Sequence, residues 1–400
     1  MVGEIVTREG RGNGILTIVS LAILLFIVSC ILLTIGSAEI TLGEIYAVIM
    51  HHLLPQTFPA QRELAGIVVW GIRLPRILMG IAAGIGLGIA GSVMQGVTKN
   101  PLASPYTLGI ASAAAFGAGI SLIIPDVAIG KEYVVTIVAS LITIPTSLFI
   151  LYIASKGREA AIRITIEVIL VASFVWLVLT RSYAFIFDPA SLVLFALIAF
   201  FIVLGLRRWK GGAGETTPKI LLACVGIGAV WSFTRFLPVI ILFDRPGAVG
   251  VVMTWSVSIL ERASWENLRL FIPLLLLYSL LLVVYLYIRK LRDFEAVSVD
   301  KGQERVVLMV IASLLVASTV RFTGTIAFLG LIAPHLAYMA VGRDNKFLIP
   351  ASGLIGALLI VGTDIVARSV IAPDVIPVGV ITGLIGIPLF IFLLVRMSQE

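Results

Sequence analysis

GIRLPRILMGIAAGIGLGIAGSVMQGV, residues 71–97, is the stretch that decides the fold class of this chain. After Arg73 and Arg76 it contains no charged residue, and it is rich in Gly and Ala. An apolar helix of this length crosses the roughly 30 Å of membrane hydrocarbon. Its small residues let neighbouring helix backbones approach closely. An Asn-Pro pair at residues 100–101 follows and ends the helix, because Pro cannot continue it. The stretch therefore predicts a transmembrane helix packed inside a bundle of other helices.

The composition extends this prediction to the whole chain. Hydrophobic residues make up 60% and charged residues 13% of the chain, and the mean hydropathy is +1.12. Soluble domains carry about 25% charged residues, so a soluble globular fold is excluded. Charge-poor windows predict twelve helices, and none shows the alternation of an outer-membrane barrel. We therefore expect an all-α polytopic membrane protein, one transmembrane domain over residues 1–400, with helices at 15–36, 76–97, 106–124, 133–154, 164–187, 190–206, 219–243, 268–288, 304–320, 322–341, 348–371 and 375–396.

The charge distribution predicts the orientation of the helices. With an even number of spans both termini lie on one side. Placing them in the cytoplasm puts 18 of the 29 Lys and Arg residues there. This excess follows the positive-inside rule, so the net charge of +7 needs no nucleic-acid partner. We expect a multi-pass protein of the cell membrane whose first helix is retained, because its charge-free core exceeds that of a signal peptide. Cys30 and Cys224 lie inside apolar spans, so no disulfide is expected.

Two shorter segments are predicted to lie along the membrane surface. Leu42, Ile45, Val48, Ile49 and Leu53 form a helical apolar stripe before Pro55, which indicates a short interfacial helix. Residues 246–260 are apolar but too short to span, which indicates an interfacial or re-entrant piece.

Several spaced motifs resemble one family of membrane proteins. Besides residues 71–105 they are LLACVGIG (221–228), GTIAFLGLIAPH (324–335), GRDNKFLIP (342–350) and PVGVITGLIGIP (377–388). Together they resemble the FecCD-type permeases, the membrane subunits of ATP-driven importers for iron-siderophores, haem and cobalamin. The resemblance implies a type II ABC importer bundle that pairs with a second copy of itself. It also implies two ATP-binding subunits, which would hold ATP and Mg, and an extracytoplasmic substrate-binding protein.

The chain departs from that family pattern in two places. The family core has ten helices, and residues 131–189 are an insertion long enough for two more, with a basic turn at residues 156–163. The cytoplasmic coupling segment, residues 290–302, lacks both family glycines, which are replaced by Arg292 and Asp300. The resemblance assigns ATPase coupling to this segment, and a solvated loop is the alternative. The residues predicted to couple are Leu291, Arg292, Asp293, Glu295 and Ala296.

At the outer end, the resemblance implies that Arg73, Arg76 and Arg368 dock the binding protein. The guanidinium fork suits two-point contact with carboxylates. Snorkelling of arginines at the membrane surface is the alternative. Asp364, four residues before Arg368 on a helix, is placed to pair with it.

At the opposite end, the resemblance implies a cytoplasmic gate at Asn100, Pro101 and Leu102, and an ordinary helix-ending turn is the alternative. Gln95 and Thr382 are candidates for lining the transport path, with helix packing as the competing role.

The remaining polar residues indicate no covalent chemistry. There is no phosphate-binding Walker A sequence, so we expect no ATPase site, no bound cofactor and hydrolysis by a separate subunit. His335 has only His51 and His52 as further histidines, so a structural role is favoured and no metal site is expected. The competing class is an ion- or proton-coupled secondary transporter. Such proteins normally carry carboxylates at mid-membrane, whereas Glu167 and Asp364 lie near span ends.

Overall fold

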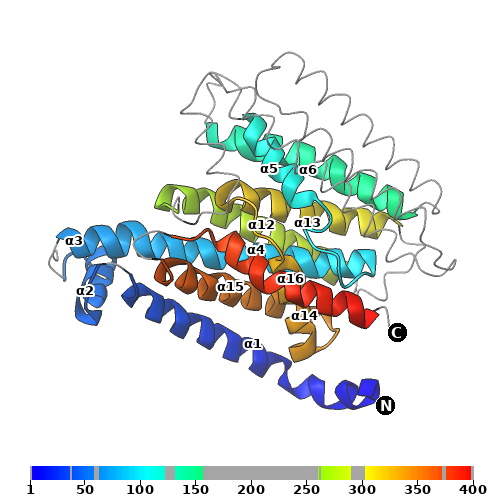
Figure 1. Ribbon diagram of the computed structural model, residues 1–400, viewed down its shortest axis with the longest axis horizontal. Helices are drawn as coiled ribbons and strands as arrows, with labels where there is room; N and C mark the ends of the chain where they lie inside the picture. Colours follow the sequence, from blue (N-terminus) through cyan, green and yellow to red (C-terminus); the bar gives the residue numbers. More distant parts are fainter. Residues whose placement is uncertain are drawn as a thin grey trace.

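The computed structural model describes residues 2–36, 38–57, 63–121, 131–155, 260, 263–289, 302–371 and 375–397 (Figure 1). The regular elements of these residues are helices. They are α1 (Val2–Thr34), α2 (Leu42–Leu53), α3 (Glu63–Gly66), the π-helix η1 (Ile67–Arg73), α4 (Leu74–Thr98), α5 (Ile110–Ser121), α6 (Lys131–Ser155), α12 (Trp265–Ile288), α13 (Gly302–Thr323), α14 (Leu329–Val341), α15 (Asn345–Ser369) and α16 (Val378–Met397).

Within the described residues, five helical stretches are long and apolar enough to cross a membrane. They are Gly14–Thr34, Glu63–Thr98, Trp265–Ile288, Gln303–Thr323 and Asn345–Ser369. The all-α class is confirmed. Three of the twelve predicted spans, 164–187, 190–206 and 219–243, lie outside the described residues, as do most of the insertion and nearly all of residues 246–260. The count of twelve therefore stays a prediction.

The span predicted at 322–341 is wrong in its beginning. The preceding helix α13 continues to Thr323, and α14 starts only at Leu329. Gly324 and Phe328 have φ of +70° and +59°, in the left-handed region. These two residues cannot continue a right-handed helix, so the chain turns between α13 and α14. A non-glycine residue in this region costs about 1–2 kcal/mol. The 13 residues of α14 reach about 20 Å, less than a full membrane crossing.

Helix α4 lies at the centre of the bundle (Figure 1). It packs along α15 and also against α13 and α14. Gly84 meets the backbone of Ala357, Gly88 meets the carbonyl of Ser352, and Gly91 meets the carbonyl of Gly330. A Cβ at any of the three would collide with main-chain atoms, which cannot rotate away. The small residues of this stretch therefore do what the sequence predicted and allow backbones to touch.

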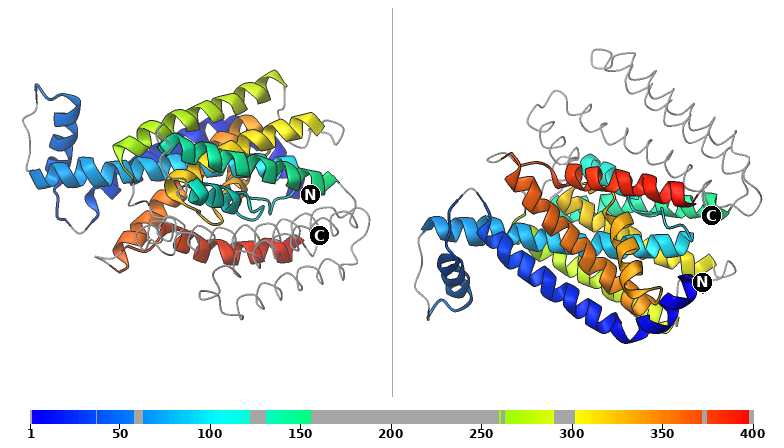
Figure 2. Two further views of the ribbon diagram at one scale, coloured as in Figure 1. Left: turned by 90° about the horizontal axis from the view of Figure 1, so that it is seen from above. Right: turned by 60° about the horizontal axis from the view of Figure 1, so that its bottom comes forward.

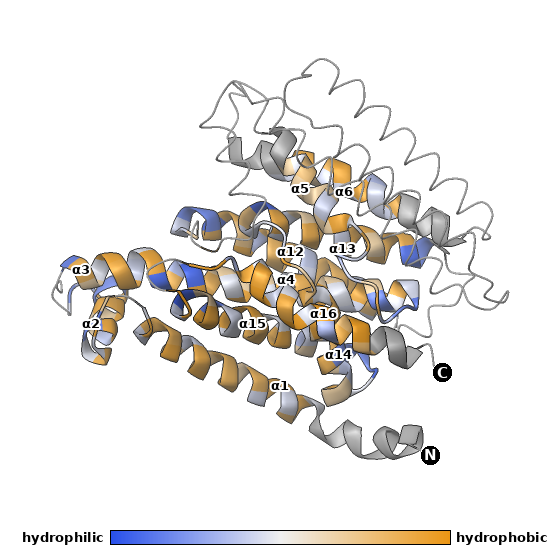
Figure 3. Cartoon of the chain, viewed as in Figure 1, coloured by the Kyte–Doolittle hydropathy of each residue, from blue (hydrophilic) through white to orange (hydrophobic). Residues whose placement is uncertain are grey.

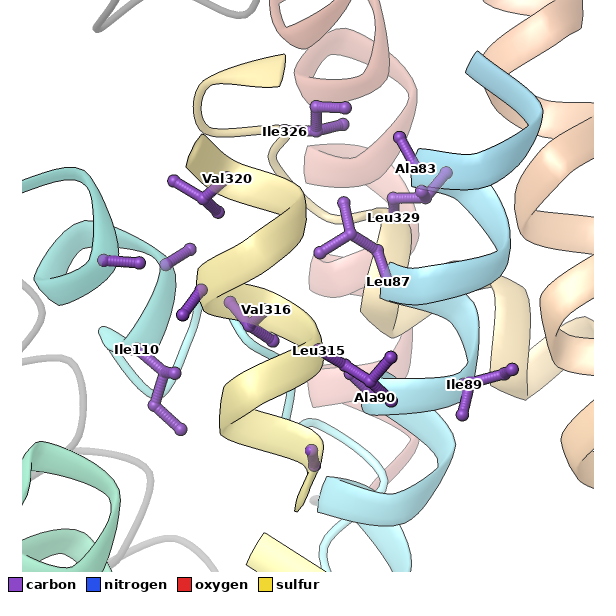
Figure 4. Close-up of a cluster of buried hydrophobic side chains, with 14 of the residues drawn as sticks. Ala83, Leu87, Ile89, Ala90, Ile110, Leu315, Val316, Val320, Ile326 and Leu329 are labelled. Atoms are coloured by element: carbon purple, nitrogen blue, oxygen red, sulfur yellow. The ribbon is translucent and has the colours of Figure 1, made fainter. Parts of the chain in front are cut away.

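The other face of α4 packs into a hydrophobic core shared with α13. Figure 4 shows Leu87 and Ala90 of α4 beside Leu315 and Val316 of α13, with Ile110 of α5 on the far side. These five residues are all nearly inaccessible. The outer helices differ. Only 11% of the apolar window of α1 and 22% of that of α12 is buried, against 83% for the span containing α4. Figure 3 shows mostly hydrophobic residues along α12 and along the coloured part of α1, a surface suited to lipid rather than water.

The short helix predicted before Pro55 is confirmed as α2, and its place at the membrane surface stays a prediction. Thr41 and Glu44 form a reciprocal capping box at its start, and Ile45 and Val48 are buried. His52, at its end, stacks on Trp70 of η1 with ring centroids 4.0 Å apart. All three views place α2 at one end of the bundle and the two chain termini at the other (Figures 1 and 2). The two ends of the chain thus lie at the same end of the bundle, and their side of the membrane stays a prediction.

Candidate docking cluster and gate

A cluster of charged side chains joins α4 to α15 at the α2 end of the bundle. Arg76 lies in the first turn of α4, and its Nε and Nη2 donate to the two carboxylate oxygens of Asp364 over 2.8–3.2 Å. Arg368 places its Nη2 3.0 Å from Asp364 Oδ2. The side chains of Arg76 and Asp364 are 6% and 3% exposed. Asp364 therefore holds two guanidinium groups at once, one from each helix.

The Asp364–Arg368 pair expected from their spacing is confirmed. The Arg76–Asp364 pair is not predictable in this way, because the two residues are 288 positions apart. A two-point contact of this kind fixes the orientation of the Arg76 fork and locks the ends of α4 and α15 together.

Arg73 has a different role in the same region. It ends η1, and its Nη1 and Nη2 donate to the carbonyls of Leu33 and Ala38, each at 2.7 Å. Leu33 belongs to the last turn of α1, where carbonyls lack helical partners. Arg73 thus supplies the missing donor and holds the turn between α1 and α2. A side chain at Gly36 would sit only 2.6 Å from Arg73 Nη2 and would have to displace this guanidinium from its carbonyl contacts.

The formal charges of Arg73, Arg76, Arg368 and Asp364 sum to +2. Arg73 and Arg76 are both about 95% buried and are committed to contacts within the chain. Arg368 is the least committed, because its contacts are to Asp364 on its own helix. Its side chain is 10% exposed, against 6% for that of Arg76, so it is the more accessible of the two guanidiniums paired with Asp364.

The predicted gate forms a tightly bonded turn at the other end of α4. Lys99 ends the helix in the left-handed conformation, with φ of 51°. Asn100 is buried, and its Oδ1 accepts from the backbone N–H of Leu102 at 2.9 Å. Thr107 then donates to the carbonyl of Leu102 at 2.9 Å. The side chain of Asn100 thus holds the turn in one conformation. This fits both a gate and a plain helix-ending turn, so the gate stays a prediction.

The candidate path residues both make internal hydrogen bonds. Gln95 Nε2 donates to the carbonyl of Leu331 at 3.3 Å, which links α4 to α14. Thr382 Oγ1 donates to the carbonyl of Gly379 within α16 at 3.1 Å. Both bonds fit the packing role, and path lining stays a prediction.

The predicted coupling residues, Leu291, Arg292, Asp293, Glu295 and Ala296, lie outside the described residues. The ends of that segment are described. Arg289 ends α12 and its Nε lies 3.4 Å from Oε1 of Glu304, in the first turn of α13. In the described part of the chain, no group of three or more His, Cys, Asp or Glu residues is placed to hold a metal ion.

A bundle in which five stretches of the described residues are long and apolar enough to cross a membrane defines a polytopic membrane protein. The family model that matches the chain is the FecCD transport family, over residues 23–175 and 164–396, and the chain belongs to this family. It is a multi-pass membrane protein.

Named relatives show the range of the family. The chain is 30% identical over 338 residues to the hemin transport system permease protein HmuU of Yersinia pestis, covering 83% of this chain and 84% of HmuU. It is 32% identical to the iron(3+)-hydroxamate import system permease protein FhuG of Bacillus subtilis, covering 83% and 84%. It is 29% identical to the cobalamin import system permease protein BtuC of Halobacterium salinarum, covering 83% and 74%.

The fold also matches a solved structure. That structure is described as an inward-facing conformation of a metal-chelate type ABC transporter. The match has a TM-score of 0.59 and 24% identity and covers 95% of this chain and 98% of that one. At this identity the likeness concerns the fold alone.

Proposed function

We propose that this chain is the membrane-spanning subunit of an ATP-driven importer for a metal chelate, such as an iron-siderophore or haem, or for a cobalamin-like cargo. Two copies would enclose a path between them. The observation that carries the proposal is the family match over nearly the whole chain. The relatives named for hemin, iron-hydroxamate and cobalamin are similar to it to nearly the same degree, so they support the cargo class without choosing within it.

Cargo would arrive on an extracytoplasmic binding protein that docks at the arginine cluster. The excess of +2 around Asp364 supports this, because an incoming carboxylate would lower the electrostatic cost of grouping three guanidiniums. Arg368 is the proposed contact residue, and Asp364 holds its fork in place. Arg73 and Arg76 add positive potential from behind while fixing α1, α4 and α15.

Energy would come from two ATP-binding subunits beneath the coupling segment, and those subunits would hold ATP and Mg. The Arg289–Glu304 ion pair supports this role, because it ties α12 and α13 together where the segment leaves and rejoins the bundle. Movement there would open and close the gate at residues 100–102 and admit cargo past Gln95 and Thr382. Both termini would be cytoplasmic, an orientation that the excess of basic residues supports.

The competing function, ion- or proton-coupled transport, is less well supported. It needs a carboxylate that changes protonation or binds an ion within the membrane. Asp364 is the described buried carboxylate at the α4–α15 junction, and two guanidinium groups already occupy it.

Reconstitution tests the proposal. The chain would be purified with its candidate ATPase and binding protein, placed in liposomes and supplied with a ferric siderophore, haemin or cyanocobalamin. We expect uptake of one cargo class that requires ATP and the binding protein. Uptake that follows an imposed proton or sodium gradient without ATP would overturn it.

A further inference from the structure

The turn between α13 and α14 holds a phenylalanine in an unfavourable backbone conformation. Phe328 has φ of 59° and ψ of −12°, the left-handed region that glycine adopts freely and other residues avoid. It occupies the N-cap position of α14, yet its side chain cannot cap the helix. Strain of this kind persists only where the surroundings hold it in place. The contacts of the ring must therefore explain the residue.

The Phe328 ring lies between two other rings, and we name Tyr106, Phe328 and Phe390 the aromatic cluster. Its centroid is 5.6 Å from that of Tyr106 and 6.1 Å from that of Phe390, both within the range of favourable ring pairs. Gly386 of α16 lies directly against Phe328, so that any side chain at Gly386 would displace the ring. The buried Leu102 and Leu331 pack beside the cluster. Tyr106 itself remains 38% exposed.

Three elements that are distant in sequence meet at this cluster. Tyr106 belongs to the loop that begins with the predicted gate, Phe328 begins α14, and Phe390 lies on α16. The loop is pressed against α14, since a side chain at Gly330 would come within 2.6 Å of Pro105 Cδ. Gln95, on the last turns of α4, is bonded to the carbonyl of Leu331. A movement of the gate turn therefore cannot occur without changing the packing of Phe328.

We propose that the aromatic cluster is an apolar seal beside the gate, and that Phe328 is the residue that positions the gate loop against α16. The seal rests on the proposed function, since it presupposes a path that must be closed between transport events. Ring packing holds Phe328 in its strained backbone conformation while the seal is closed. When the rings separate the strain is released, which offsets part of the packing lost on opening. The seal thus has a closed state, with packed rings and a strained Phe328 backbone, and an open state, with separated rings and a relaxed backbone.

Passive leakage tests the seal without cargo, ATP or a binding protein. The full-length chain would be reconstituted in liposomes that contain carboxyfluorescein, and dye efflux would be measured. We expect Phe328→Ala to raise the efflux rate at least tenfold, with Phe328→Leu and Tyr106→Ala giving smaller increases. Phe322→Ala is the matched control, because Phe322 is a mostly buried ring on α13 stacked on Phe271 rather than on the cluster. Equal leakage from the control would show general loosening of the bundle and would overturn the proposal.

A second pair of variants tests the strain separately from the seal. Phe328→Gly and Phe328→Ala both remove the ring, but only glycine relieves the left-handed backbone. We expect the glycine variant to have the higher melting temperature, although glycine normally destabilises relative to alanine. A lower melting temperature for the glycine variant would overturn the strain argument.

The two proposals fail in different ways. If the wild-type complex shows no ATP-driven uptake but Phe328→Ala leaks and Phe322→Ala does not, the seal stands and the importer function falls. If uptake is ATP-driven and no cluster variant leaks, including Phe328→Leu and Tyr106→Ala, the seal is wrong and the function stands.

Discussion

Removing the charge of Asp364 while keeping its shape, as in Asp364→Asn, leaves Arg76 and Arg368 facing each other without a counter-charge. Both Arg76 and Asp364 are more than 90% buried, so water cannot replace the lost partner. Removing one partner of a buried pair typically costs about 3–5 kcal/mol. Because two guanidiniums lose the same carboxylate, we expect the loss in unfolding free energy to lie at the upper end of this range. Equilibrium unfolding in mixed micelles measures it.

Two controls isolate the cause. Asp344→Asn removes a carboxylate from the opposite end of the same helix, where it is exposed and serves as N-cap. Because Asn caps as well as Asp, we expect a change below about 0.5 kcal/mol. Asp364→Asn leaves both Arg76 and Arg368 without a partner, whereas the double variant Arg76→Met with Asp364→Leu leaves only Arg368 unpaired. The double variant should therefore lose less unfolding free energy than the single one. A loss below about 1 kcal/mol for Asp364→Asn would refute the reasoning, since that is the range of a solvent-screened surface pair.

Four further predictions concern docking, ATPase coupling, helix packing and topology, and those on coupling and topology rest on the sequence alone. Arg368→Glu should weaken binding-protein affinity at least tenfold, about 1.4 kcal/mol or more, with wild-type binding falling as salt rises; unchanged affinity and salt dependence in a binding titration would remove the docking role. Reversing Asp293 and Glu295 to Lys should weaken assembly with the ATPase or uncouple hydrolysis from transport, whereas normal assembly and transport would leave the segment as a solvated loop. Gly88→Val should lower the unfolding free energy by about 1–3 kcal/mol or more, because the new side chain meets the backbone of Ser352. Gly362→Ala is the control, since open space surrounds Gly362, and it should be neutral or slightly stabilising. Melting temperatures of the two variants test the difference. Cysteines near Lys156, Lys210 and Lys301 should be labelled from the cytoplasm and those near Arg62 and Pro246 from outside, and outside labelling near Lys156 would contradict the two-helix insertion.

The helices of this chain were predictable from the sequence wherever the burial of apolar residues alone decides their position. Apolar windows located the membrane-spanning parts of α1, α4, α12 and α15, because each must bury or immerse a long charge-free stretch, although α1 itself begins earlier, at Val2. The apolar stripe of α2 was also visible, because its residues repeat at helical spacing. The prediction was wrong at the start of α14, because hydropathy does not record backbone conformation. Residues 324–328 are as apolar as a helix but turn through two left-handed positions.

The contacts of the site were predictable only within one helix. The spacing of Asp364 and Arg368 indicated their pair, whereas Arg76 reaches Asp364 through the fold. The partners of Arg73 are main-chain carbonyls. Every residue has a main-chain carbonyl, so the sequence cannot indicate which ones accept from Arg73. For the same reason, Phe328 resembles any other core phenylalanine until its φ is known.

The arginine cluster shows why structural and docking roles need not exclude each other. An incoming carboxylate would not have to displace Asp364, because three guanidiniums and one carboxylate still leave a formal charge of +2. It would bind the outermost fork and share the field of the two arginines behind it. The buried pair would then keep α4 and α15 in register while the partner attaches. If the binding protein docks at Arg368 as proposed, its carboxylate would supply part of the missing negative charge while the buried Arg76–Asp364 pair stays in place.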